Sequence, residues 1–299
     1  MKKSGMKNKF SPLFLVLGIV LAIYAISLFI PIVWAILTSL KDNINDLLWN
    51  DRLQAPNTFG LPDPFKFENY SVVFNYFFVP IDSGRDVMFP ELLINSLLYA
   101  TGNAIAHTTV IFIVAYACAR FDFKIGKVIY FTVILGMILP LVGSQPSMVA
   151  VAKQMGLYDT MWGQWLMNAH YLGMYFLVMH ATLKAYPKDF DEAAQIDGAN
   201  NLSVMFKIMF PLSITTFSTI LLLMFIQHWN NYTSPMLLMP NIPTVAYALR
   251  YFDTTSNNDL TNTPSKLAAC LLVAVPTLTL FLIFHDRLLN NVSIGGVKE

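Results

Sequence analysis

The sequence predicts an all-α integral membrane protein with six transmembrane helices. Of its 299 residues, 56% are hydrophobic and only 12% are charged, whereas a soluble domain carries about 25% charged residues. A helix needs about 20 apolar residues to cross a hydrocarbon core about 30 Å thick, and the alternating pattern of a membrane β-barrel is absent. Six stretches of sufficient length lack Asp, Glu, Lys and Arg, namely 10–40, 92–119, 128–152, 160–183, 208–249 and 267–285.

The first apolar stretch predicts a spanning helix over 12–38, which follows a cytoplasmic tail over 1–11. A long external loop is expected over 39–91, where prolines and acidic residues mix with aromatic residues that favour membrane surfaces. The remaining helices are expected to form a core transmembrane domain over 92–290. A cytoplasmic tail is expected over 291–299.

The core domain should hold the other five spanning helices. Pro235, Pro240 and Pro243 interrupt the long stretch 208–249, so one crossing followed by an external loop explains that stretch better than two crossings. The five helices are expected at 92–119, 127–151, 162–184, 212–235 and 266–288.

The distribution of basic residues predicts the orientation in a bacterial cell membrane. Twelve of the 19 Lys and Arg residues lie in the two tails and in the connections after the second and fourth helices, which leaves seven for the longer loops on the other side. Basic residues favour the cytoplasmic side, so both termini are expected in the cytoplasm. The net charge of +1 gives no indication of nucleic-acid binding.

The connection over 187–211 is a polar island between the fourth and fifth helices. Asp189 is expected to cap a short helix. Asp191 and Glu192 would then occupy its first turn, where the helix dipole favours negative charge. Gly198 is expected to end this helix, because glycine readily adopts the left-handed conformation found at helix C-termini.

A second, amphipathic helix is expected after this break, with Asn201 as its cap and Pro211 at the entry to the fifth spanning helix. On the first short helix one face combines two small residues with an aromatic and an acidic one, which leaves room for another surface to approach closely. That face consists of Phe190, Ala193, Ala194 and Asp197. Docking of another protein and attachment of the helix pair to the membrane surface explain the spacing equally well.

Polar residues inside the apolar stretches are candidates for a solute pathway, because polar groups in lipid usually face a bundle interior or a water-filled route. The candidates are Asn95, Asn103, His107, Gln145, Asn168, His170, His180, Gln227, His228, Asn230 and Asn231. Amide and aromatic side chains suit a polyhydroxylated ligand, which singles out Asn95, Gln227, Trp229, Asn230 and Tyr232. Interhelical hydrogen bonding and interfacial anchoring are the alternative explanation.

The sequence contains no pattern for a metal site or for nucleotide hydrolysis. No two of the five histidines are spaced i, i+3 or i, i+4, and no HExxH motif occurs. No GxxxxGK[ST] phosphate loop occurs either. We therefore expect the chain to bind no metal or cofactor and not to hydrolyse ATP itself.

The polar island resembles the EAA loop of permease subunits in ATP-binding-cassette importers. The resemblance rests on Glu192-Ala193-Ala194, Asp197-Gly198 and Pro211. Flanking segments resemble the carbohydrate-uptake branch, and most closely the maltose-type second permease subunit with its MetI-like domain. These segments are Phe67-Glu68-Asn69-Tyr70, Asn95-Ser96-Leu97, Ala115-Tyr116-Ala117, Arg120-Phe121, Trp229-Asn230 and Gly295-Gly296-Val297-Lys298. The segment over 76–90 is longer than usual for these permeases.

This resemblance implies a heteromeric importer. Its other parts would be a second permease subunit, a cytoplasmic dimer of ATP-binding subunits that holds ATP and Mg, and an extracytoplasmic solute-binding protein that delivers a sugar or oligosaccharide. Glu192, Ala193, Ala194, Asp197, Gly198 and Pro211 would couple this chain to the ATPase. The alternatives are an importer of a non-sugar solute and, more remotely, an integral-membrane enzyme, although the acidic residues lie outside the spans.

Overall fold

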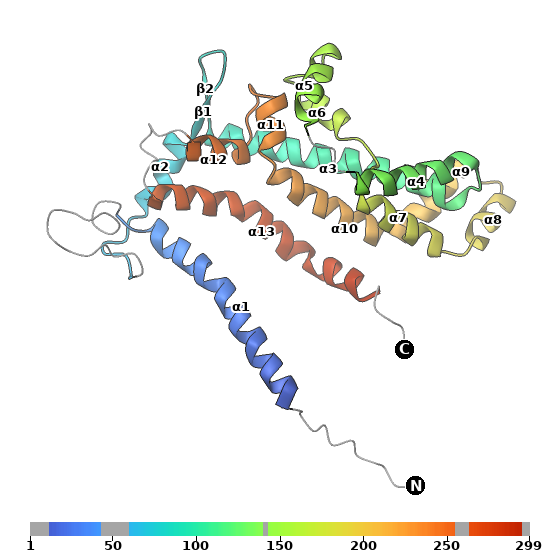
Figure 1. Ribbon diagram of the computed structural model, residues 1–299, viewed down its shortest axis with the longest axis horizontal. Helices are drawn as coiled ribbons and strands as arrows, with labels where there is room; N and C mark the ends of the chain where they lie inside the picture. Colours follow the sequence, from blue (N-terminus) through green and yellow to red (C-terminus); the bar gives the residue numbers. More distant parts are fainter. Residues whose placement is uncertain (1–11, 43–59, 140–142, 255–262, 295–299) are drawn as a thin grey trace, which may run out of the picture. The chain divides into compact units, whose positions relative to one another are not determined.

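The computed structural model describes residues 12–42, 60–139, 143–254 and 263–294 (Figure 1). The expected N-terminal tail over 1–11, part of the external loop and the end of the C-terminal tail lie outside the described residues. The chain divides into two compact units. The first comprises residues up to Tyr76 together with 257–272, and the second comprises 77–256 together with 273–299. Each unit is described separately below.

The first unit contains the long apolar helix α1 (Pro12–Ser39) and the short helix α2 (Glu68–Tyr76). The large apolar side chains of α1 are exposed along almost its whole length, which suits a helix surrounded by lipid. Asn69 on α2 donates to the carbonyl oxygens of Ser39 and Lys41 at 2.8 and 2.9 Å. These bonds satisfy carbonyl groups at and just beyond the end of α1 and fasten α2 beside it.

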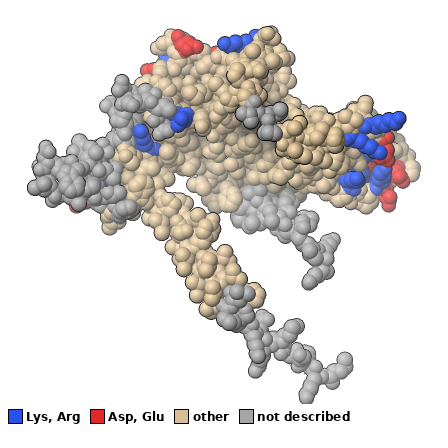
Figure 2. Space-filling view, viewed as in Figure 1, with Lys and Arg blue, Asp and Glu red and all other residues tan. Residues whose placement is uncertain are grey.

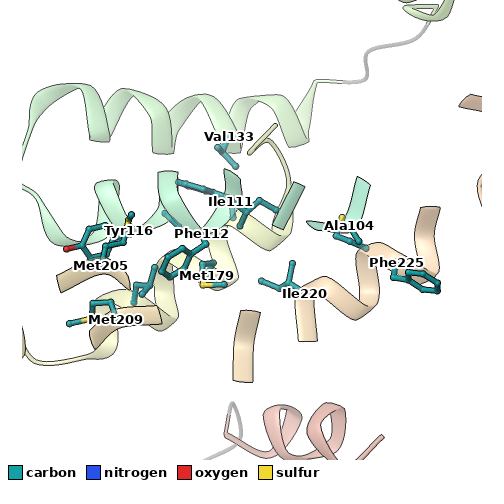
Figure 3. Packing of buried hydrophobic residues seen from close by; sticks show 14 of the residues in the cluster. Ala104, Ile111, Phe112, Tyr116, Val133, Met179, Met205, Met209, Ile220 and Phe225 are labelled. Carbon is teal, nitrogen blue, oxygen red and sulfur yellow. The ribbon is translucent and has the colours of Figure 1, made fainter. Parts of the chain in front are cut away.

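The second unit is organised around α3 (Phe89–Arg120), a helix of 32 residues. It packs along α10 (Phe210–Trp229) and α7 (Met174–Ala185), as Figure 1 shows. Fully buried side chains of the three helices form the core, which also receives Val133 from α4 (Figure 3). The core residues include Ala104, Ile111 and Phe112 on α3, Phe176 and Met179 on α7, and Ile220 on α10.

A small β-hairpin precedes α3. Strands β1 (Phe78–Pro80) and β2 (Asp86–Met88) pair antiparallel, with Phe78 opposite Met88. The hairpin lies within the stretch expected to be an external loop, and the purely helical prediction missed it. Three-residue strands leave too little alternation in the sequence for a periodic pattern to emerge.

Two of the predicted spans are broken in the structure. The span expected over 127–151 is divided into α4 (Lys124–Ile138) and α5 (Gln145–Gln154). Leu139 adopts φ −80° and ψ 116°, because the proline that follows it disfavours the helical conformation. The prediction of one continuous helix here was wrong.

The span expected over 162–184 is divided into α6 (Met161–Met167) and α7. Gly173, at the end of the break, has φ +133° and precedes the first residue of α7. Such a conformation is accessible to glycine and interrupts a helix. The glycine was visible in the sequence, but a lone glycine within an apolar stretch does not dictate a break.

The last part of the chain holds α11 (Thr233–Leu238), α12 (Val245–Thr254) and α13 (Thr263–Ile294). Helix α10 ends at Trp229 rather than at the expected residue 235. Among the described residues, four helical runs are long and apolar enough to cross a membrane: Phe14–Ser39, Phe89–Arg120, Asn201–Trp229 and Thr263–Phe284. The described structure thus supports a helical membrane protein with four long apolar helices, not the full set of six.

Gly102 on α3 lies against Trp165 on α6, which leads to a prediction. A methyl group at Gly102 would overlap the indole of Trp165, whereas nothing lies within 4 Å of a methyl group at Gly136 on α4. Alanine favours helix over glycine by about 1 kcal/mol, but overpacking costs about 1–3 kcal/mol. We therefore expect Gly102→Ala to lower the thermal unfolding temperature of the detergent-solubilised protein.

The matched control is Gly136→Ala, which should leave the unfolding temperature unchanged or raise it. Equal increases for both variants would show that Trp165 does not restrict the space at Gly102.

Candidate functional site

The polar island begins with α8 (Asp189–Ile196). The cap position is Lys188 rather than the expected Asp189, which lies in the first turn together with Asp191 and Glu192. The three carboxylates therefore all lie at the positive end of the helix dipole. The prediction of the acidic first turn is confirmed, and the prediction of the cap was wrong by one residue.

Gly198 follows the end of α8 with φ +85°. Its N–H donates to the carbonyl of Gln195 at 3.0 Å, and the N–H of Ala199 donates to the carbonyl of Ala194 at 2.9 Å. These bonds satisfy carbonyl groups that the helix end would otherwise leave unpaired. A glycine at this position therefore closes the helix and turns the chain.

The second helical run starts with α9 (Asn201–Val204). Its cap is Asn200, whose side chain accepts from the N–H of Ser203 at 2.8 Å, so the expected cap at Asn201 was wrong by one residue. The π-helical turn η2 (Met205–Met209) follows and leads directly into α10. Pro211 thus lies inside one continuous run, not at its start. A proline lacks the N–H needed for the regular bond, and the wide turn just before it is a usual accommodation of such strain.

Arg120, the last residue of α3, connects this island to the core. Its Nε donates to Oδ2 of Asp191 at 2.6 Å. One terminal nitrogen donates to the carbonyl of Tyr186 at 2.7 Å and the other to the carbonyl of Pro187 at 2.9 Å. The side chain of Arg120 is only 2% exposed and that of Asp191 14% exposed. The planar guanidinium can bond several acceptors at fixed angles, so it holds α8 against the ends of α3 and α7.

From the sequence, Arg120 was expected to be one of the basic residues on the cytoplasmic side and part of the permease resemblance, and its contact with the acidic island was missed. The signal was present, because an arginine at the end of a long apolar helix needs acceptors. The nearest acidic island along the chain begins about 70 residues later, so spacing could not identify the partner.

The face expected to combine Phe190, Ala193, Ala194 and Asp197 is divided in the structure. Ala194 is buried in the hydrophobic core, whereas Glu192 and Ala193 are exposed. Ile196 is 86% exposed and Phe190 is 45% exposed. Figure 2 shows basic and acidic side chains gathered at the end of the molecule where α8 lies. Exposed apolar side chains within a charged surface are typical of protein-contacting surfaces.

The five residues expected along a solute pathway do not converge. Trp229 is 3% exposed, stacks on Phe225 and donates to the carbonyl of Val273 at 3.2 Å. Asn230 donates to Ile226 and Asn95 donates to Pro243, in each case to the carbonyl oxygen. The ring of Tyr232 lies 5.8 Å from the guanidinium carbon of Arg250. Of the five, Gln227 lines a cavity together with other polar residues.

That cavity has a volume of about 260 Å³ and lies between α3, α10 and the break before α7. Its polar wall consists of His107, Asn168, His170, Gln227, His228 and Asn231. The rings of His107 and His170 lie 4.3 Å apart, and those of His107 and His228 lie 6.3 Å apart. The sequence did not predict that these residues lie together, because the three histidines are about 60 residues apart in the chain. Among the described residues, no three His, Cys, Asp or Glu side chains are grouped so that they could hold a metal ion.

The Arg120 contacts generate a stability prediction. Replacing Arg120 by alanine leaves the buried Asp191 carboxylate uncompensated and should cost about 3–5 kcal/mol of unfolding free energy. Arg120→Lys should also destabilise the protein, because one ammonium cannot reach both the carboxylate and the carbonyl groups that the guanidinium bonds. Thermal or denaturant unfolding in detergent measures both effects.

Lys188→Ala provides the control. Lys188 pairs with Asp122 at 3.5 Å, but the two side chains are 60% and 94% exposed, so this variant should lie within about 1 kcal/mol of the parent protein. An equally small effect of Arg120→Ala would contradict the structural role assigned to Arg120.

Comparison with known proteins supplies the family. The family model "Binding-protein-dependent transport system inner membrane component" matches residues 107–293. The diacetylchitobiose uptake system permease protein NgcG of Streptomyces coelicolor is 23% identical over 283 residues, covering 93% of this chain and 87% of that protein. The arabinooligosaccharides transport system permease protein AraQ of Bacillus subtilis is 24% identical over 240 residues, covering 79% and 80%.

A solved structure has the same fold. It is the crystal structure of a bacterial ABC transporter involved in the import of the acidic polysaccharide alginate, with a TM-score of 0.75 and 22% identity over 95% of this chain and 99% of that chain. The family match covers more than half of the chain and includes the Arg120 contacts, the polar island and the histidine-lined cavity. The chain therefore belongs to the binding-protein-dependent transport system inner membrane components, the permease family of ABC transporters.

Proposed function

We propose that this chain is one of two permease subunits of an ATP-driven importer for a sugar or oligosaccharide. A separate cytoplasmic pair of ATP-binding subunits would hydrolyse ATP with Mg, and an extracytoplasmic binding protein would deliver the solute. This chain would then provide half of the pathway and no catalytic group. Relatives named for diacetylchitobiose, arabinooligosaccharides and trehalose support the choice of carbohydrate.

The observation that carries this proposal is the attachment of α8 to the core. The guanidinium of Arg120 bonds Asp191 and the carbonyl groups of Tyr186 and Pro187, so a force applied to α8 reaches α3 directly. The exposed residues Glu192, Ala193 and Ile196 lie on the same helix. We infer that this helix is where the ATP-binding subunit docks, with Asp197, Gly198 and Pro211 shaping the turn and the helix that follow.

A non-sugar solute is the second candidate. The osmoprotective compounds uptake permease protein GgtD of a Synechocystis strain is 31% identical over 144 residues, which cover 47% of this chain. A small osmolyte is therefore the comparator in the following experiment.

The test is transport by the complete assembly, purified with its partner subunits and reconstituted in proteoliposomes. Radiolabelled diacetylchitobiose, trehalose, arabinotriose and glycine betaine form the solute panel. We expect ATP-dependent accumulation of at least one carbohydrate and none of glycine betaine. Accumulation of glycine betaine alone would replace the sugar proposal with the osmolyte one.

Gly198 provides a test of coupling at a single position. Its φ of +85° disfavours residues with a β-carbon, although nothing would crowd that carbon within 4 Å. Gly198→Val should therefore strain the backbone by about 1–3 kcal/mol and distort the end of α8. We expect ATP-dependent uptake to fall about tenfold, since about 1.4 kcal/mol corresponds to a factor of ten.

Gly198→Asn is the matched control, because asparagine tolerates the left-handed region. It should retain uptake to within about twofold, a difference of about 0.4 kcal/mol. Equal uptake by the valine and asparagine variants, with both assemblies intact on a sizing column, would remove the coupling role from this turn.

Orientation in the membrane is tested by labelling. Cys118 and Cys270 are first replaced by alanine, because both are free thiols. Single cysteines are then placed at Ser83 in the hairpin turn and at Gln195 on α8, two exposed positions. An impermeant maleimide should label Ser83→Cys in intact cells and Gln195→Cys only after permeabilisation. The opposite pattern would invert the proposed topology, in which both termini are cytoplasmic.

A further inference from the structure

The cavity beside His107 is built from three separate parts of the second unit. His107 comes from α3, His228 and Gln227 come from α10, and His170 comes from the break between α6 and α7. Non-helical backbone at membrane depth is stable only where protein buries it or where it lines a wet cavity. The interruption that divides the predicted span over 162–184 lines this cavity, which explains how non-helical backbone is accommodated there.

Two buried imidazoles that line the cavity have ring nitrogens with no hydrogen-bond partner among the described residues. His107 is 8% exposed and His228 is 5% exposed. Neither Nδ1 of His107 nor either ring nitrogen of His228 makes a hydrogen bond with the described residues. An unpaired polar group in a protein interior is costly, and an apolar residue would fill either position with less penalty. These nitrogens have almost no accessible surface in this structure, so a group in the cavity would reach them only when the rings turn toward it.

The chemistry of the wall indicates what that group is. Imidazole and amide side chains each combine hydrogen-bond donors and acceptors, which matches hydroxyl groups. No Asp, Glu, Lys or Arg is among the described residues that line the cavity. A strongly charged solute would find no opposite charge there, whereas a neutral hydroxylated one would find six polar side chains. Tyr175 adds an aromatic ring to the same wall.

We propose that this cavity is a contact site for a neutral, hydroxylated solute during its passage through the permease, with His107, His228 and Gln227 as its hydrogen-bonding residues. The inference rests on the proposed importer function and adds the place and chemical class of the contact. It differs from the expected cluster around Trp229 and Asn230, whose polar groups bond to the protein itself.

The experiment uses the reconstituted assembly and whichever of diacetylchitobiose, trehalose and arabinotriose the parent protein accumulates. We expect His107→Leu and His228→Leu each to lower the maximal uptake rate about tenfold, equivalent to about 1.4 kcal/mol. The glutamine variants at the same positions retain a donor and an acceptor and should keep the rate to within about threefold. Solute affinity of the isolated binding protein should not change.

Two further variants separate contact from packing. Gln227 is an exposed residue of the cavity wall, so Gln227→Leu can lower uptake without disturbing the core. His180→Leu is the control, because this half-buried histidine faces Tyr130, with ring centroids 4.9 Å apart, and lines a different cavity. It should transport like the parent protein.

The outcomes distinguish the two proposals. If leucine and glutamine variants at His107 and His228 transport alike, or if Gln227→Leu transports normally, the cavity does not contact the solute, while the importer function stands. If the parent assembly hydrolyses ATP but accumulates none of the three carbohydrates, the sugar function fails and the contact site falls with it. Loss of uptake in the leucine variants alone, with unchanged thermal stability, supports the contact site.

Discussion

The ion pair between the buried Arg120 and the half-buried Asp191 is the constraint on which the arrangement of helices around the polar island depends. A guanidinium removed from water must have its charge compensated and its donors bonded, and here a carboxylate and backbone carbonyls at the end of α7 do both. The ends of α3, α7 and α8 are therefore held together at the Arg120 guanidinium. Any movement of α8 must carry the end of α3 with it or expose the charge.

Helix α3 extends this constraint through the second unit. It packs along α7 and α10 over most of its length, and its buried residues are largely small or aromatic. Close-packed interiors do not deform smoothly, so we expect the three helices to move together. The docking surface proposed on α8 and the histidine-lined cavity belong to that body, which gives a physical route from one to the other.

The sequence was most informative where a single physical rule applied. Lack of charge over long stretches identified the four long apolar helices found among the described residues, and Gly198 was correctly placed at the end of a helix with positive φ. The division into α4 and α5 and the break between α6 and α7 were missed, because proline and glycine permit a break without dictating one. Convergence of His107, His170 and His228 depends on how three elements pack, which no local pattern encodes. Trp229 was expected in a solute pathway because an aromatic side chain suits a polyhydroxylated ligand. Its ring N–H instead donates to the carbonyl of Val273, so the same side chain serves packing between helices.

The π-helical turn at Met205–Met209 changes the direction in which the side chains that follow it on α10 point. Each residue advances an α-helix by about 100°, and a π turn contains one residue more than the α turn that it replaces. Every side chain that follows on α10 is therefore rotated by about a quarter of a circle relative to an unbroken α-helix. Gln227 and His228, which line the cavity, lie on the part of the helix that carries this offset. The direction in which the far end of the helix presents its polar groups is thus set some 20 residues earlier, beside the polar island.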